Sequence, residues 1–244
     1  MKSLSVSLLA LLALGCRTGI VDCDRGAMQL ANASSGQDSE RPLSVGFLVI
    51  DGVYNTELTA PFDMFHHTVF HTKPGMRVFT VAPTLEPVTT FEGLRLLPDY
   101  SFADAPEIDV LVVASAEHNM DTDLEDEELI DWVRRTGEDA DYVVSLCDGA
   151  FVLAQAGLLD ARQATTFPSD IPRMRTMFST RVDVLDGVSF VHDGPAITSV
   201  GGAKSFDAAL YLCELLYGAR AARGIAGGLV IDWDLTAIDH LVVP

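Results

Sequence analysis

Short apolar runs alternate with segments of helical periodicity along most of the chain. Four near-continuous apolar runs predict buried strands, at residues 43–51, 76–82, 108–115 and 142–147. Apolar positions at helical spacing predict three helices, over residues 57–71, 123–136 and 203–217. Because strands separated by helices form a parallel sheet that is covered on both faces, the pattern predicts an α/β fold.

Shorter elements are expected between and after these. Residues 84–102 are typical of a hairpin or ribbon with Gly93 near its turn, and residues 162–167, 181–194 and 195–200 supply short strands. His192 is expected in a hairpin turn. Residues 223–244 are expected to form a packing extension that covers a sheet edge or a dimer interface.

One cysteine stands between a predicted strand and a predicted helix. The strand over residues 142–147 ends on Cys147, and Gly149 opens a helical pattern directly afterwards. A sharp strand-to-helix turn exposes a nucleophile and directs backbone N–H groups and a helix terminus toward it, which favours a thiolate. The alternative is a buried structural cysteine, as we expect for Cys213 on the packed face of its helix.

The first residues have the features of an export signal. Lys2 is followed by an apolar run from Leu4 to Leu14, which is shorter than the ~20 residues that span a membrane. Leu-Ala-Leu-Gly-Cys resembles the lipobox of bacterial lipoproteins, which implies a signal peptide over 1–15 and lipidation of Cys16. We therefore expect a lipid-anchored protein of the bacterial cell envelope, on the periplasmic side of the outer membrane. A cleaved signal with an incidental cysteine is the alternative.

Composition divides the rest of the chain and excludes one class of partner. Residues 16–42 are rich in Gly, Ser, Asp and Asn and are expected to be a flexible tether, so the domain proper spans 43–244. With 16 basic against 35 acidic residues, the formal charge is −19, which argues against nucleic acid as a partner. The only expected membrane association is the lipid anchor.

Neither acidic nor histidine-containing segments indicate a metal or cofactor. Residues 120–132 lack the ligand spacing of a calcium loop and are more typical of a solvated helix face. His67 and His71 are one helical turn apart, but no third ligand accompanies them. We therefore predict a site without metal or cofactor.

The predicted sheet gathers four loops at one edge. In parallel sheets, ligands bind outside the carboxyl ends of the strands. The loops after Asp51, Ser115, Cys147 and Val200 would converge there. These loops define the candidate site.

Three segments resemble a known family in the expected order. SLCDGAFVLAQAGLLDARQATTFP (145–168), ELTAPFDMF (57–65) and AITSVGGAKSFDAALYLCELLYG (196–218) are similar to the ThiJ/PfpI family, of the class I glutamine amidotransferase-like superfamily. The resemblance implies a flavodoxin-like three-layer sandwich with a mainly parallel sheet and a reactive nucleophile-elbow cysteine. It also implies an acid after the first strand that hydrogen-bonds the sulfur, and Glu57 occupies that position.

A charge estimate constrains the pairing of Glu57 with Cys147. At an effective dielectric constant of about 20, an ionised carboxylate ~5 Å away opposes a thiolate by roughly 3 kcal/mol. A helix terminus contributes only about 0.3–1 kcal/mol in the other direction. We therefore expect Glu57 to act as a protonated partner that donates to the sulfur.

The chain departs from the resembled pattern where that family often carries histidines and glycines. Phe167 and Asp148 occupy the two usual histidine positions, and Ser115-Ala116-Glu117 replaces a Gly-Gly turn. His118, in the loop after residues 108–115, is a candidate replacement base. Asp148 is a second candidate acid or base, with capping of the following helix as its alternative role.

Two functions fit these residues. In the first, Cys147 attacks a small electrophile, such as a carbonyl, amide or isonitrile carbon, in a hydrolase, hydratase or lyase reaction with Glu57 as protonated partner. In the second, the protein is a non-catalytic redox sensor or small-ligand-binding lipoprotein that uses oxidation of Cys147. The expected partner is a small molecule in either case, and a homodimer is possible.

Overall fold

The computed structural model describes residues 41–244. The predicted signal peptide, Cys16 and nearly all of the predicted tether lie outside the described residues, so the lipid anchor stays a prediction. Across the described range, no helix has both the length and the apolar character that crossing a membrane requires.

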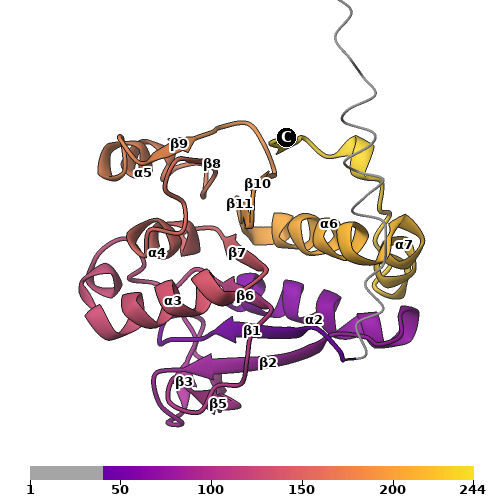
Figure 1. Cartoon of the computed structure of the whole chain (residues 1–244), viewed down its shortest axis with the longest axis horizontal. Coiled ribbons are helices and arrows are strands. Elements are labelled where there is room, and N and C mark those ends of the chain that lie inside the picture. Colours follow the sequence, from indigo (N-terminus) through magenta and orange to yellow (C-terminus); the bar gives the residue numbers. More distant parts are fainter. Residues whose placement is uncertain (1–40) are drawn as a thin grey trace, which may run out of the picture.

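Within residues 41–244, eight strands form one central sheet in the order β12-β10-β11-β7-β6-β1-β2-β5 (Figure 1). Neighbouring strands run parallel except for β10 and β11, which are antiparallel. This arrangement confirms the predicted α/β fold with a mainly parallel sheet. The strands are β1 (Ser44–Leu48), β2 (Arg77–Ala82), β5 (Tyr100–Ser101), β6 (Val110–Val113), β7 (Tyr142–Leu146), β10 (Phe190–Asp193), β11 (Ala196–Ser199) and β12 (His240–Val242).

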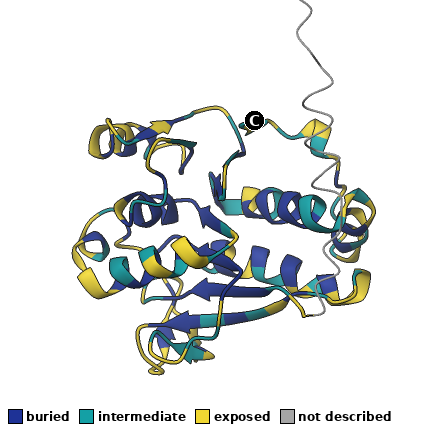
Figure 2. Ribbon diagram, viewed as in Figure 1, coloured by how far each residue is buried: buried dark blue, intermediate teal, exposed yellow. Residues whose placement is uncertain are grey.

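Helices cover both faces of this sheet and give it three layers. On one face, α2 (Asn55–His71), α6 (Ser205–Tyr217) and α7 (Ala219–Gly228) share a core with the sheet. On the other face, α3 (Glu127–Asp139) and α4 (Gly149–Gln155) pack in a second core. The strands between them are buried over most of their length (Figure 2). Apolar side chains on both sides of the strands explain their near-continuous apolar runs.

Two small sheets lie outside the central one. The hairpin of β3 (Val88–Thr89) and β4 (Arg95–Leu96) has Gly93 in its turn, as the sequence predicts. The strands β8 (Arg162–Ala164) and β9 (Val182–Val184) pair in parallel, and the segment that connects them contains α5 (Ile171–Met177), a helix that the apolar pattern does not predict.

Two helices begin later than the sequence predicts. The helix expected from residue 123 begins at Glu127, because the Asp126 carboxylate accepts hydrogen bonds from the N–H groups of Glu128 and Leu129 at 3.0 and 3.1 Å. Thr122–Glu125 is a separate 3₁₀ turn. A further 3₁₀ turn at Gly202–Lys204 delays α6 to Ser205.

The end of the chain closes one edge of the sheet. After α7 and a 3₁₀ turn at Leu235–Ala237, β12 pairs with β10 in parallel. His192 lies within β10, opposite Ile197 of β11, so its predicted placement in the turn itself is wrong. The tail thus supplies a strand to the sheet edge, in line with its expected packing role.

The start of α4 lies very close to the end of β6. A Cβ atom added to Gly149 would lie 2.1 Å from the Val113 carbonyl oxygen, a distance that side-chain carbon atoms do not reach. Glycine at this position therefore lets α4 begin directly after β7 without pushing β6 aside.

We predict that Gly149→Ala lowers the free energy of unfolding by at least about 2 kcal/mol, because the added methyl group collides with backbone. Chemical denaturation measures this change. Gly227→Ala is the matched control, since Gly227 lies in α7 with no atom within 4 Å of an added Cβ. It should be neutral or stabilising by up to about 1 kcal/mol. Equal effects of the two substitutions would contradict the prediction.

Candidate active site

Cys147 lies on a sharp turn between β7 and α4. Its φ angle is +53°, in the left-handed region that non-glycine residues rarely adopt. Its backbone N–H donates to the Ser199 carbonyl oxygen at 2.9 Å, which fixes the turn to the end of β11. Such a conformation costs about 1–3 kcal/mol and persists only where the surroundings enforce it. The structure thus has the predicted strand-to-helix elbow.

A glycine turn packs directly against this elbow. A Cβ added to Gly201 would lie 2.4 Å from the Cys147 Cβ, and the φ angle of Gly201 is +79°. The next residue, Gly202, donates its backbone N–H to Glu57 Oε1 at 2.9 Å. The loop after Val200, which the sequence places at the candidate site, thus brings the first turn of α2 and the elbow together.

Glu57 is 8 % exposed and lies in the first turn of α2. Its charge acts on the Cys147 thiol, so the two predicted partners are near each other. Within residues 41–244, however, the hydrogen bond that its carboxyl group makes is with Gly202. Donation from Glu57 to the sulfur therefore stays a prediction.

The surroundings of Cys147 favour the thiol over the thiolate, contrary to our expectation from the elbow. The residue is only 8 % exposed, and this burial raises the pKa of its thiol above the ordinary range. The charge of Asp148, and that of Glu57 when it is ionised, raise the pKa further, while the Ser115 hydroxyl and the Asp148 backbone N–H lower it. Burial and two acids outweigh the turn and the helix terminus.

Asp148 is 9 % exposed and does not cap the helix that follows it. It stands at the N-cap position of α4, but its side chain makes no capping hydrogen bond, so the capping role is wrong. Its Oδ1 instead accepts a hydrogen bond from Thr166 Oγ1 at 3.0 Å. Burial, with a smaller contribution from the charge of Asp170, raises the pKa of Asp148 to about 6. A carboxyl group with this pKa exchanges protons near neutral pH.

His118 lies away from the sulfur. Its side chain is 54 % exposed, and its Nδ1 lies 3.4 Å from Asp121 Oδ1. No hydrogen bond joins it to Cys147 within residues 41–244, and it is not among the groups that shift the pKa of that thiol most strongly. The structure therefore does not bring this candidate base to the elbow.

The turn that replaces Gly-Gly has few free donors. The N–H of Ala116 donates to Asn119 Oδ1 at 2.8 Å, and that of Glu117 donates to the Gly52 carbonyl oxygen at 3.1 Å. The Ser115 hydroxyl is buried and has no hydrogen-bond partner in the described part of the chain, and it favours the thiolate form of Cys147. Ser115 is therefore a hydroxyl donor that a ligand or thiolate could use.

Sequence reasoning did not identify Ser115 or Thr166 as functional. Thr166 Oγ1 contacts both the Cys147 carbonyl oxygen, at 3.1 Å, and Asp148. Its position in the ATTFP segment, directly before Phe167, was the only available signal. Phe167 itself is partly exposed and provides no titratable group where the resembled family often has histidine.

The described residues contain no cluster of three or more His, Cys, Asp or Glu side chains arranged to hold a metal. His67 Nδ1 instead contacts the Asp63 carbonyl oxygen at 2.9 Å on α2. The absence of a metal or cofactor from the reaction stays a prediction.

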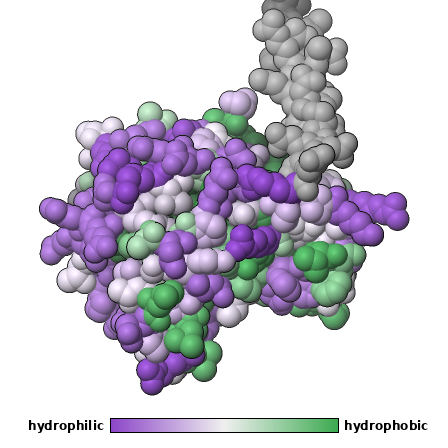
Figure 3. Space-filling view, turned by 60° about the horizontal axis from the view of Figure 1, so that its bottom comes forward, coloured by the Kyte–Doolittle hydropathy of each residue, from purple (hydrophilic) through white to green (hydrophobic). Residues whose placement is uncertain are grey.

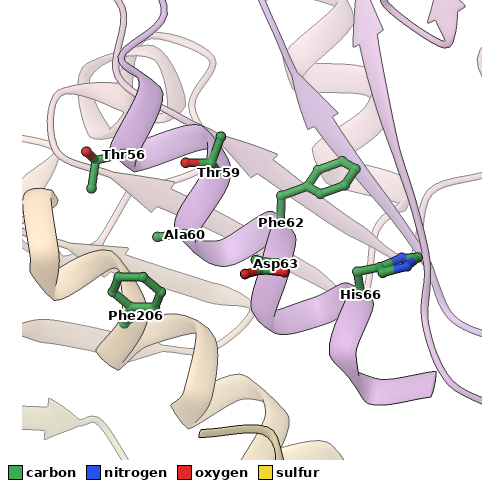
Figure 4. Close-up of a pocket in the computed structure, with 7 residues that line it drawn as sticks. All are labelled: Thr56, Thr59, Ala60, Phe62, Asp63, His66 and Phe206. Carbon is green, nitrogen blue, oxygen red and sulfur yellow. The ribbon is translucent and has the colours of Figure 1, made fainter. Parts of the chain in front are cut away.

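An open groove of about 550 Å³ lies between α2 and α6 (Figure 4). Its lining residues are Thr56, Thr59, Ala60, Phe62, Asp63, His66 and Phe206. Neither Cys147 nor either of its acidic neighbours lines it. The groove is therefore separate from the elbow, although it begins beside Glu57.

Comparison with known protein families shows which family contains this elbow. The DJ-1/PfpI family model matches residues 43–215, which include the elbow, the glycine turn and Glu57. The chain belongs to the DJ-1/PfpI family. The resemblance inferred from the three sequence segments is thereby confirmed. The flavodoxin-like fold of the DJ-1/PfpI domain is also found in a ThiJ/PfpI family protein from Pseudomonas syringae, with a TM-score of 0.71 and 24 % identity over 80 % of this chain and 77 % of that one.

Proteins similar to this DJ-1/PfpI protein carry names that describe different functions. An isonitrile hydratase from Pseudomonas putida is 35 % identical over 181 residues, which cover 74 % of this chain and 75 % of that protein. The HTH-type transcriptional regulator CdhR from Pseudomonas aeruginosa is 31 % identical over 112 residues, or 46 % of this chain and 33 % of the regulator. The proteins that this chain is similar to therefore include an enzyme and a transcriptional regulator.

We predict that Asp148→Asn lowers the pKa of Cys147, because it removes the acidic charge that raises it most. Alkylation by iodoacetamide at pH 8 should become about 3- to 10-fold faster, as measured by intact mass. Asp121→Asn, at an exposed position paired with His118, should leave the rate unchanged. An unchanged rate in Asp148→Asn would show that this carboxylate does not control the thiol.

Proposed function

We propose that this DJ-1/PfpI protein is a cysteine-dependent hydratase that adds water to the carbon of a small isonitrile. The observation that carries the proposal is a buried thiol held in the field of two carboxyl groups, Asp148 and Glu57. The similarity to an isonitrile hydratase supports this choice over the hydrolase and lyase reactions that the elbow also allows.

A protonated thiol suits this substrate. The terminal carbon of an isonitrile must receive both a nucleophile and a proton, whereas a carbonyl carbon receives only the nucleophile. A thiol that keeps its proton until the substrate arrives can act as the nucleophile when a neighbouring base accepts that proton during attack, while a separate acid protonates the carbon. Asp148, adjacent to Cys147 and with a pKa of about 6, is ionised at neutral pH and can take that role.

In the first half-reaction, the sulfur bonds to the isonitrile carbon as Asp148 accepts the S–H proton. Glu57, acting as a carboxylic acid, protonates the same carbon. The product is a thioformimidate on Cys147, with Asp148 protonated and Glu57 ionised. The hydrogen bond from Gly202 to Oε1 orients the Glu57 carboxyl group and leaves Oε2 for proton transfer.

In the second half-reaction, water attacks the thioformimidate carbon. Glu57 takes one water proton, and Asp148 gives its proton to the nitrogen. The carbon–sulfur bond then breaks, the hydroxyl proton returns to the sulfur, and an N-substituted formamide leaves. The buried Ser115 hydroxyl is available to donate to the sulfur as it departs. Cys147, Asp148 and Glu57 therefore end in their starting protonation states.

Ligand binding without turnover is the alternative function. It is favoured by the similarity to a transcriptional regulator and by the missing histidines, since His118 does not replace them. Redox sensing through Cys147 is disfavoured, because peroxide oxidises thiolates and the pKa of this thiol is raised. Binding of an isonitrile by calorimetry, with no formamide produced, would support this alternative.

We predict that purified protein converts isonitriles to formamides and that Cys147→Ser and Cys147→Ala abolish this turnover. Glu57→Gln should lower kcat by about 10²–10⁴-fold, because an amide keeps the hydrogen bond from Gly202 but cannot transfer a proton. Formamide release is followed by chromatography. Cys213→Ser is the control, because Cys213 is fully buried in the core on α6. Turnover that survives Cys147→Ala would contradict the mechanism.

A second prediction concerns pH. Because Asp148 must be ionised to accept the thiol proton, kcat/KM should rise with pH through about 6 and level off above pH 7. In Asp148→Asn this limb should disappear and the remaining rate should be low. A rate that falls as pH rises through 6 would assign Asp148 as an acid and reverse its role.

A further inference from the structure

An aromatic side chain stands beside the elbow without a role in the mechanism above. Tyr54 is half-buried and directly precedes α2. Its backbone N–H donates to the Ser115 carbonyl oxygen at 2.9 Å, and the adjacent Val53 forms a β-bridge with Ala116. Tyr54 is thus fixed to the loop that flanks Cys147.

The β3–β4 hairpin braces the Tyr54 ring. The Phe91 and Tyr54 rings are tilted by 31°, with centroids 4.5 Å apart. The Phe91 N–H donates to the Val53 carbonyl oxygen at 3.0 Å. The Gly52 N–H donates to the Thr89 carbonyl oxygen at 2.8 Å. These contacts join the hairpin to the loop before α2 and restrict the movement of the aromatic pair.

Apolar surface continues outward from this pair. Phe91 is 51 % exposed, and Leu94 and Leu97 on the same segment are also exposed. Figure 3 shows apolar side chains gathered at the lower end of the molecule, in the part that contains the hairpin. A substrate that approaches Cys147 past Tyr54 therefore meets an apolar and aromatic surface.

The phenol itself lies in the field of the site. Burial raises its pKa, and the acidic groups of Cys147, Glu117, Asp148 and Glu57 add to this effect when they are ionised. The phenol is therefore neutral at physiological pH. The charged groups that act most strongly on Tyr54, Cys147 and Asp148 are all acidic, so an anionic substrate would be repelled.

We propose that Tyr54, braced by Phe91, determines specificity by receiving the aromatic substituent of an uncharged substrate above Cys147. Stacking against the phenol ring orients the substituent while the acidic surroundings exclude carboxylate-bearing analogues. This inference deepens the proposed hydratase function and rests on it for the identity of the reaction. The recognition itself requires only that Cys147 be reached past Tyr54.

The test uses alkylation of Cys147, which does not depend on turnover. Rates with N-benzyl-iodoacetamide, iodoacetamide and iodoacetate are measured by intact mass in the wild type, Tyr54→Ala, Tyr54→Phe and the control Phe70→Ala, which removes an exposed aromatic ring from the last turn of α2. Glutathione supplies the intrinsic rate ratios of the three reagents. The rate with each reagent is divided by the rate with iodoacetamide. Because all three reagents attack the same sulfur, any effect of a changed thiol pKa cancels in this ratio.

Relative to glutathione, the wild type should favour the benzyl reagent about 2- to 10-fold and disfavour iodoacetate. Tyr54→Ala should lose the benzyl preference, whereas Tyr54→Phe and Phe70→Ala should keep it. A wild-type ratio equal to that of glutathione, or a preference that survives Tyr54→Ala, would overturn the proposal. Circular dichroism and thermal melting check that each variant is folded.

Steady-state kinetics separate this proposal from the hydratase assignment. With benzyl isonitrile, Tyr54→Ala should raise KM about 2- to 10-fold relative to methyl isonitrile, with a smaller change in kcat. If the wild type hydrates neither isonitrile but alkylation keeps its Tyr54-dependent preference, the hydratase function fails and the recognition role stands. If isonitriles are hydrated with no dependence on Tyr54, only the recognition role fails.

Discussion

The site depends on the close approach of three backbone segments around Cys147. Gly149 lies against the Val113 carbonyl oxygen of β6, and Gly201 lies against the Cys147 Cβ. No side chain fits at either glycine, so the elbow can keep its left-handed φ angle only while both neighbours stay in place. The parallel order of β6, β7 and β11 brings these segments together, because their carboxyl ends meet at one edge of the sheet.

The same approach determines the electrostatics. It buries the sulfur between Asp148, from its own turn, and Glu57, which the Gly202 N–H holds on α2. Each pKa unit corresponds to about 1.4 kcal/mol, so burial and two acids readily outweigh a helix terminus worth less than about 1 kcal/mol. A thiol beside carboxyl groups stays protonated at neutral pH. A cysteine paired with histidine differs, because there the thiolate is favoured.

The sequence predicts the parts of this arrangement that follow from periodicity and motif. Apolar runs indicate the central strands, and the strand–Cys147–glycine pattern indicates the elbow. The orientation of short polar side chains at strand ends is not predicted, because no periodicity shows which way the side chain of Ser115 or Thr166 points. The protonation of Cys147 was misjudged for a related reason: a motif shows the turn and the helix terminus, whereas burial and the position of Asp148 depend on the folded chain. Tyr54 gains its importance only from the hairpin that packs against it.

A thiol with a raised pKa also affects how the protein withstands an oxidising environment. Peroxides and disulfides react with thiolates, and the resting sulfur of Cys147 is protonated and nearly inaccessible. In the proposed mechanism, its nucleophilicity at neutral pH increases when a substrate is bound and a neighbouring carboxylate accepts the thiol proton. Reactivity that is conditional on occupancy would spare the nucleophile from irreversible damage between encounters, at the expense of a slower first step.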